Sequence, residues 1–145
     1  MQNLFLVKVR YARIDEKSGS ERKVTESYLL DAVSFTEAEA RINEEMKEII
    51  NGEFLIVSIA RANFSEIFTD SEGSIWYKAK IKFVSIDDQS GREKKISNNI
   101  LIMADNVDEA YKNINEAMNG FTVDFEIEGI TDSKIYDFFP YITKE

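Results

Sequence analysis

The chain reads KVRYARIDEKSG at residues 8–19 and KIKFVSIDDQSG at residues 80–91, a constant offset of 72. This offset holds from Lys8/Lys80 to Met46/Met118, and 15 of the 39 aligned pairs are identical. Self-similarity over so long a stretch is typical of an internal repeat. We therefore predict a tandem duplication of one unit of about seventy residues.

Each copy opens with a pattern of strands. Apolar and charged residues alternate over residues 5–11, and the second copy repeats this alternation over residues 77–83. A period of two predicts a half-buried strand. Each strand leads into a polar turn that ends at Gly19 or Gly91, where glycine is able to adopt a positive φ. A second strand follows, so each copy should begin with a β-hairpin.

A helix is predicted after each hairpin. Ser34 and Asn106 are N-cap residue types, and each is followed three positions later by glutamate, as in a capping box. Apolar residues then recur at helical spacing until the Asn-Gly pairs at residues 51–52 and 119–120. A closing strand follows, and its alternation is clearest at residues 123–128.

Beyond the helices the best sequence match has an offset of 68, which aligns Ile59 with Ile127 and Ser65 with Ser133. A loss of four residues is close to one helical turn. The first helix should therefore be about one turn longer than the second.

These elements predict an α+β fold in which a strand-strand-helix-strand unit occurs twice. Amphipathic helices and strands must cover each other, so we expect two helices on antiparallel sheet, related by a pseudo-two-fold axis. The repeats should span residues 1–70 and 74–140, joined by a linker at about residues 69–74. Together they should form a single compact domain over residues 1–145.

The composition excludes several classes of function. The chain has no histidine and no cysteine. It therefore lacks a Ser-His-Asp triad, a thiol nucleophile, and imidazole or thiolate metal ligands. We expect no catalytic residues, no cofactor and no metal site, and the protein should not be an enzyme. The carboxylates of the two hairpin turns are interpreted as exposed turn residues because lysines lie among them.

No apolar stretch is long enough to span a bilayer, and the first residues lack the pattern of a signal peptide. A cytoplasmic protein without membrane association is therefore expected.

Charge divides unevenly along the chain. The hairpin segments, residues 1–31 and 74–103, carry a net charge of +4, whereas the remaining residues carry −13. One hypothesis makes the outer sheet face of the second copy a platform for phosphates or single-stranded nucleic acid. Its candidate residues are Trp76, Lys78, Lys80, Lys82, Lys95 and Asn99.

The alternative is that these lysines pair across the sheet with Asp124, Glu126 and Glu128 as an opposite-charge ladder. The net charge of −9 and a pI near 4.7 oppose association with nucleic acid at long range.

An aromatic end follows the second copy, and the polar linker after the first copy offers no counterpart. Phe138, Phe139 and Tyr141 are candidate binding residues because apolar surface is costly to leave in water. They should pack into the groove between the two halves or dock on another subunit or partner.

The repeated Ile-Asp-x-x-Ser-Gly turn, the two capped helices and the end Phe138-Phe139-Pro140-Tyr141 resemble an uncharacterised domain-of-unknown-function family of anaerobic gut bacteria and their phages. The resemblance covers nearly the whole chain. It implies a small intracellular protein that can be carried on mobile elements, and it brings no functional residues to transfer.

The leading hypothesis is a non-catalytic binding or assembly protein of the bacterial or phage cytoplasm. It would act on a protein partner or on itself through a sheet edge, the cleft between its halves or its aromatic end. The alternative is a nucleic-acid or nucleotide-binding accessory protein that uses the basic outer face, and an enzyme with paired carboxylates ranks third.

Overall fold

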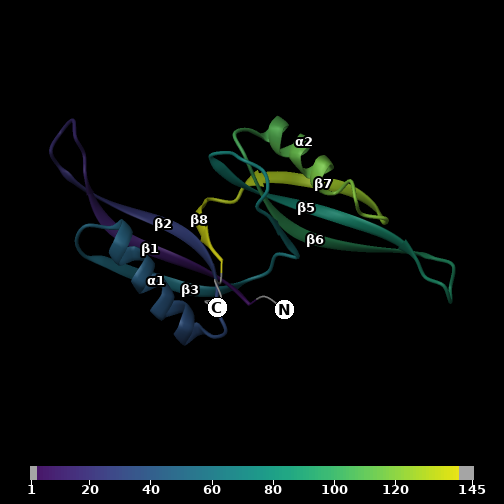
Figure 1. The fold of residues 1–145 in the computed structure, drawn as a ribbon, viewed down its shortest axis with the longest axis horizontal. Coiled ribbons are helices and arrows are strands. Elements are labelled where there is room, and N and C mark those ends of the chain that lie inside the picture. Colours follow the sequence, from purple (N-terminus) through teal and green to yellow (C-terminus); the bar gives the residue numbers. More distant parts are fainter. Residues whose placement is uncertain (1–2, 141–145) are drawn as a thin grey trace. The chain divides into compact units, whose positions relative to one another are not determined.

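The computed structural model describes residues 3–140. Over these residues the chain forms an α+β fold with two helices and eight strands in two four-stranded sheets (Figure 1). The first five elements are β1 (Leu4–Ile14), β2 (Glu21–Asp31), α1 (Phe35–Ile49), β3 (Phe54–Ala62) and β4 (Glu66–Phe68). The others are β5 (Ile75–Ile86), β6 (Glu93–Ala104), α2 (Val107–Ala117), β7 (Asp124–Asp132) and β8 (Ile135–Phe139). Neither of these helices is long and apolar enough to cross a membrane.

The described residues divide into two compact units. The first unit contains residues 3–62 and 135–140, and the second contains residues 63–134. The strand order is β3-β1-β2-β8 in the first sheet and β7-β5-β6-β4 in the second. Each unit therefore places a central hairpin between the strand that follows its helix and one shorter strand.

The shorter strand of each sheet comes from the other predicted repeat. Strand β8 lies in the second predicted repeat but pairs with β2, and β4 lies in the first predicted repeat but pairs with β6. Both pairings are parallel, so the sheets are mixed. The expectation of an antiparallel sheet is correct for the other pairings and wrong for these two.

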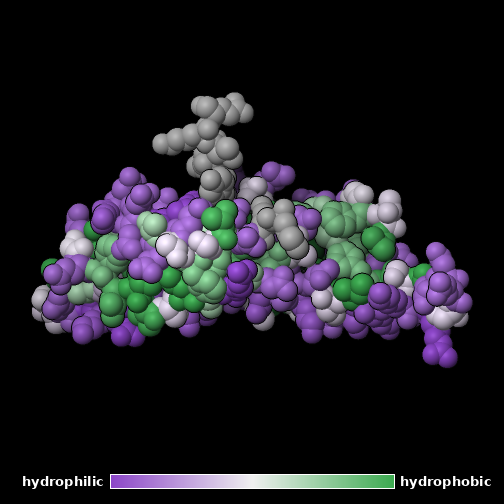
Figure 2. Space-filling view, turned by 90° about the horizontal axis from the view of Figure 1, so that it is seen from below, coloured by the Kyte–Doolittle hydropathy of each residue, from purple (hydrophilic) through white to green (hydrophobic). Residues whose placement is uncertain are grey.

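One apolar core lies between helix and sheet in each unit. In the first unit, Ala38, Ile42 and Met46 of α1 pack on β1 and β2. In the second unit, Ala110 and Ile114 of α2 pack on β5 and β6. The alternation of β1 and β5 buries one residue in two, which is what one covered sheet face requires. On the face seen in Figure 2, hydrophobic side chains gather in patches among hydrophilic ones.

The predicted local signals are confirmed. The side chains of Ser34 and Asn106 accept hydrogen bonds from the backbone amides of Glu37 and Glu109, at 3.2 and 2.8 Å. Gly19 and Gly91 have φ angles of +70° and +68°. Helix α1 has 15 residues and α2 has 11, the difference of one turn that the sequence predicts.

The offset of 68 beyond the helices is wrong. Val9 pairs with Ile56, and Ile81, its equivalent, pairs with Ile127. Ile127 therefore corresponds to Ile56, at an offset of 71. The turn missing from α2 is replaced by a longer connection, residues 118–123, where the first unit has residues 50–53.

The same register gives the aromatic end a counterpart. Phe138 pairs with Leu29, and Ile67 pairs with Leu101, the equivalent of Leu29. The aromatic end therefore corresponds to β4, and the expectation that it was unmatched is wrong.

Candidate functional site

The structure brings five of the predicted site residues onto one sheet face. Lys78, Lys80 and Lys82 alternate along β5 on the face that points away from α2. Asn99 is in register with Lys80, and Lys95 is in register with Val84. Lys78, Lys80, Lys95 and Asn99 are exposed or half-buried, so this face is open to solvent.

One part of this face carries an opposite-charge contact. The Nζ of Lys82 lies 3.9 Å from Oε2 of Glu128, and the hydroxyl of Ser97 donates to Oε1 of Glu128 at 2.7 Å. The hydrogen bond from Ser97 lowers the pKa of Glu128, and the positive charges of Lys82 and Lys80 act in the same direction. The ammonium of Lys82 is therefore already engaged by a carboxylate.

Trp76 lies on the same strand but is only 6% exposed. It is in register with Met103 near the end of the sheet. A buried indole offers no free face to a nucleic-acid base, so stacking on Trp76 would require it to move.

The aromatic end lies in the other unit. Phe138 and Phe139 belong to β8, and the ring of Phe139 stacks on Tyr28 with centroids 5.6 Å apart. Phe139 is half-buried against the first core, so part of its apolar surface is covered. Tyr141 lies outside the described residues.

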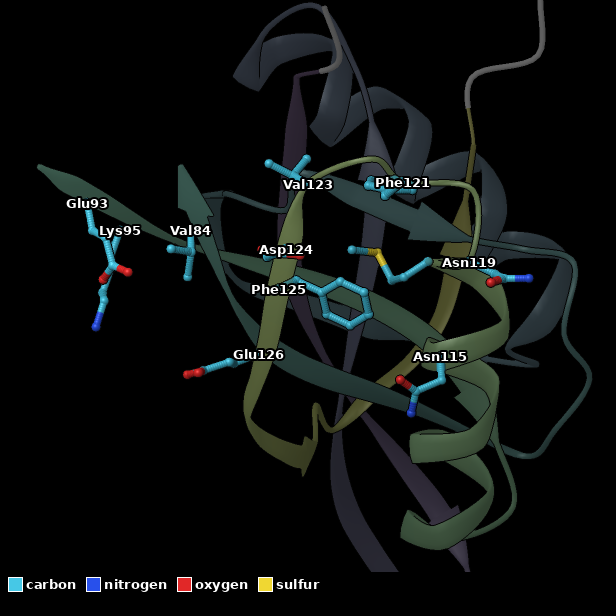
Figure 3. A pocket seen from close by; sticks show the side chains of 11 residues that line it. Val84, Glu93, Lys95, Asn115, Asn119, Phe121, Val123, Asp124, Phe125 and Glu126 are labelled. Carbon is cyan, nitrogen blue, oxygen red and sulfur yellow. The ribbon is translucent and has the colours of Figure 1, made fainter. Parts of the chain in front are cut away.

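Sequence reasoning missed a pocket in the second unit, although Lys95 belongs to it. The pocket has a volume of about 790 Å³ and lies between the end of α2, the connection at residues 118–123, the start of β7 and the adjacent ends of β5 and β6. In Figure 3 the ring of Phe125 points from β7 toward α2, from which Asn115 projects.

Its lining combines apolar and acidic groups. Met118 is buried, whereas Phe121 and Val123 are 40% and 41% exposed. Three carboxylates, those of Glu93, Asp124 and Glu126, oppose the single ammonium of Lys95. A sequence signal was available, because Phe121 and Val123 are apolar residues in a connection that is longer than its equivalent in the first unit.

The pocket adjoins a sheet edge. Among the described residues, β7 pairs only with β5, so the outward N–H and C=O groups of β7 have no strand partner. Its register shifts between Lys80 and Ile81, which marks a β-bulge near Gly129. Asp124, Phe125 and Glu126 begin this edge and also line the pocket. A peptide that pairs with β7 would therefore pass directly over the pocket.

The comparisons with known proteins give a family but no activity. A family model described as a domain of unknown function, DUF4494, matches residues 3–141. No curated protein and no solved structure matches the chain.

Proposed function

Since the chain belongs to the DUF4494 family of unknown function, we propose that it is a non-catalytic binding protein of the bacterial or phage cytoplasm whose partner is a basic, extended protein segment. The segment adds a strand to the edge of β7 and places an apolar side chain in the pocket of Figure 3. The absence of histidine and cysteine favours binding over catalysis.

The observation that carries this proposal is the continuity between the pocket and the unpaired edge. In strand addition, main-chain hydrogen bonds supply affinity and pockets for alternate side chains supply specificity. The edge of β7 offers the hydrogen bonds, and the half-exposed side chains of Phe121 and Val123 offer apolar contact at its start. Burial of such apolar surface favours a complex.

Charge indicates which segment fits. Strand β7 exposes Asp124 and Glu126 at the pocket, and Glu93 of β6 lines the same pocket. A basic segment complements these carboxylates. A second copy of β7 does not, because like charges directly opposite each other destabilise a strand pair.

We propose further that the chain arose by tandem duplication and works as one domain. The offset of 72 and the matching strand orders support the duplication. The exchange of β4 and β8 supports the single domain, because neither sequence copy completes its own sheet.

Binding of nucleic acid to the basic face of β5 is the second candidate. The exposed Lys78 and Lys80 favour it. The engagement of Lys82 by Glu128, the burial of Trp76 and the net charge of −9 weigh against it.

Synthetic peptides of about ten residues, the length of a long strand, test the proposal. One peptide set alternates lysine with valine or leucine, a second replaces each lysine by glutamate, and single-stranded DNA and RNA serve as the competing class. Isothermal titration should detect binding of the basic peptides alone. Binding only of nucleic acid would contradict the proposal and favour the second candidate.

A matched pair of charge reversals locates the site. Glu93→Lys should weaken peptide binding about tenfold, because it replaces an attractive charge beside the pocket by a repulsive one. Glu21→Lys makes the same change at the equivalent position of the first unit and should leave the affinity unchanged. Equal effects of the two variants would show that only net charge matters, which would reject a site at β7.

A further inference from the structure

The first unit contains a smaller pocket with a different chemistry. It has a volume of about 290 Å³ and lies between the stem of the β1–β2 hairpin, the end of α1 and strand β8. Its lining includes three tyrosines and three other polar side chains: Tyr11, Tyr28, Tyr136, Arg13, Glu26 and Asn51. We refer to it as the tyrosine pocket.

Tyr28 carries a buried hydroxyl for which the described residues provide no hydrogen-bond partner. The side chain is 0% exposed, and burial raises the pKa of Tyr28, with the charge of Glu26 as the second cause. Tyr28 itself lines the tyrosine pocket, together with Tyr11, Glu26 and Tyr136. A buried hydroxyl without a partner is costly, so it needs a partner from outside the described chain.

The charged groups of the tyrosine pocket are already balanced. The hydroxyl of Tyr11 donates to Oε1 of Glu26, and Nη2 of Arg13 donates to the hydroxyl of Tyr11 at 3.1 Å. One carboxylate and one guanidinium thus meet on a single phenol oxygen. This pairing leaves Oε2 of Glu26 as an acceptor and gives the pocket no net preference for an anion or a cation.

The second unit shows that the fold does not require these polar groups. Phe83, Asn98 and Ile100 occupy the register positions of Tyr11, Glu26 and Tyr28. Ile100 is 1% exposed and belongs to the second core, so a purely apolar side chain fills this position. The hydroxyl of Tyr28 is therefore not needed to fill this core position.

We propose that the tyrosine pocket binds a neutral, planar heterocycle with N–H groups, of the size of a nucleobase. Tyr136 is 61% exposed and offers a ring face for stacking. The hydroxyl of Tyr28 has no accessible surface in the free protein, so it pairs with a carbonyl or ring nitrogen of the ligand after the side chains around it move. Oε2 of Glu26 accepts a ligand N–H. The volume of about 290 Å³ is close to the lower end of the range for small-molecule sites, which suits a single base.

Titration calorimetry with adenosine, guanosine, cytidine and uridine tests this site on the full chain. At least one of these nucleosides should bind the wild type. Tyr28→Phe removes one hydroxyl and keeps the ring. It should lower the affinity for that nucleoside about tenfold, which is the effect of one lost hydrogen bond. Without nucleoside, its melting temperature should stay unchanged or rise, because the removed group has no partner in the described chain.

Two further variants make the outcome decisive. Glu26→Gln should also lower the affinity for the nucleoside, because it replaces a carboxylate acceptor by an amide. Tyr111→Phe removes the hydroxyl of an exposed tyrosine on α2 and should leave the affinity unchanged. Failure of all four nucleosides to bind the wild type would overturn the proposal and leave a buried water as the partner of Tyr28. Equal binding to wild type and Tyr28→Phe would also overturn it, because the ligand would then lie elsewhere.

Discussion

The rings of Phe139 and Tyr28 stack with their centroids 5.6 Å apart and their planes 13° apart. This contact joins β8, which follows the second unit in the sequence, to the core of the first unit. Phe68 holds the corresponding position in the second unit, because it pairs with Ile102 as Phe139 pairs with Leu30. Phe139 therefore contributes to the unit that contains β1 and β2, and Phe68 contributes to the unit that contains β5 and β6.

Alanine substitution of these residues should show the exchange. Phe139→Ala should lower the free energy of unfolding by about 2 kcal/mol, because the ring is half-buried and stacked. In the Phe139→Ala variant, amide hydrogen exchange should accelerate more in β2 than in β6. In the Phe68→Ala variant, it should accelerate more in β6 than in β2. Faster exchange in β6 for Phe139→Ala would contradict the pairing of β8 with β2.

Substitution by alanine should have different effects on stability at two glycines. A Cβ at Gly73 would lie 2.4 Å from the Cα of Ala104, whereas a Cβ at Gly129 would meet no atom within 4 Å. Gly73→Ala should therefore destabilise the protein by about 3 kcal/mol, the cost of forcing backbone apart. Gly129→Ala should change the stability by less than about 0.5 kcal/mol. Urea denaturation measures both, and similar values for the two would disprove the close approach at Ala104.

The pKa of Glu128 provides a test of the basic face. It is lowered chiefly by the hydroxyl of Ser97 and secondly by Lys82, so this stabilisation is present at neutral pH and is lost as the pH falls through the folded pKa. Ser97→Ala should raise the pKa of Glu128 toward its ordinary value, and Ser97→Thr should preserve it. A carboxyl ¹³C titration checks this, and an unchanged pKa in Ser97→Ala would remove the hydrogen bond as its cause.

The sequence predicts the local elements well because each is encoded by nearby residues. The alternation at residues 5–11 and 77–83, the turn glycines and the caps Ser34 and Asn106 all have the conformations expected of them. The partner of a strand is not encoded by nearby residues in the same way. The side-chain pattern of β4 or β8 states which face is buried but not which sheet the strand joins, so the parallel pairings were missed.

The offset of 68 failed for a related reason. It rested on the match of Ser65 with Ser133, whereas the ladder aligns Ile56 with Ile127. Hydrogen-bond register, which a string comparison does not contain, decides such equivalences. The tyrosine pocket was missed as well, because the sequence comparison aligns Tyr28 with Ile100, and both residue types are common in a core. Only the packing shows that the hydroxyl of Tyr28 is buried without a partner among the described residues.

Hydrogen exchange at the edge of β7 tests the proposed function most directly. The outward amides of β7 have no strand partner among the described residues and should exchange rapidly in the free protein. With a saturating basic, alternating peptide, these amides should become protected, whereas those of the edge strand β3 in the first unit should not. Protection confined to β7 is the result that strand addition predicts. Peptide binding that leaves the β7 amides unprotected would contradict it.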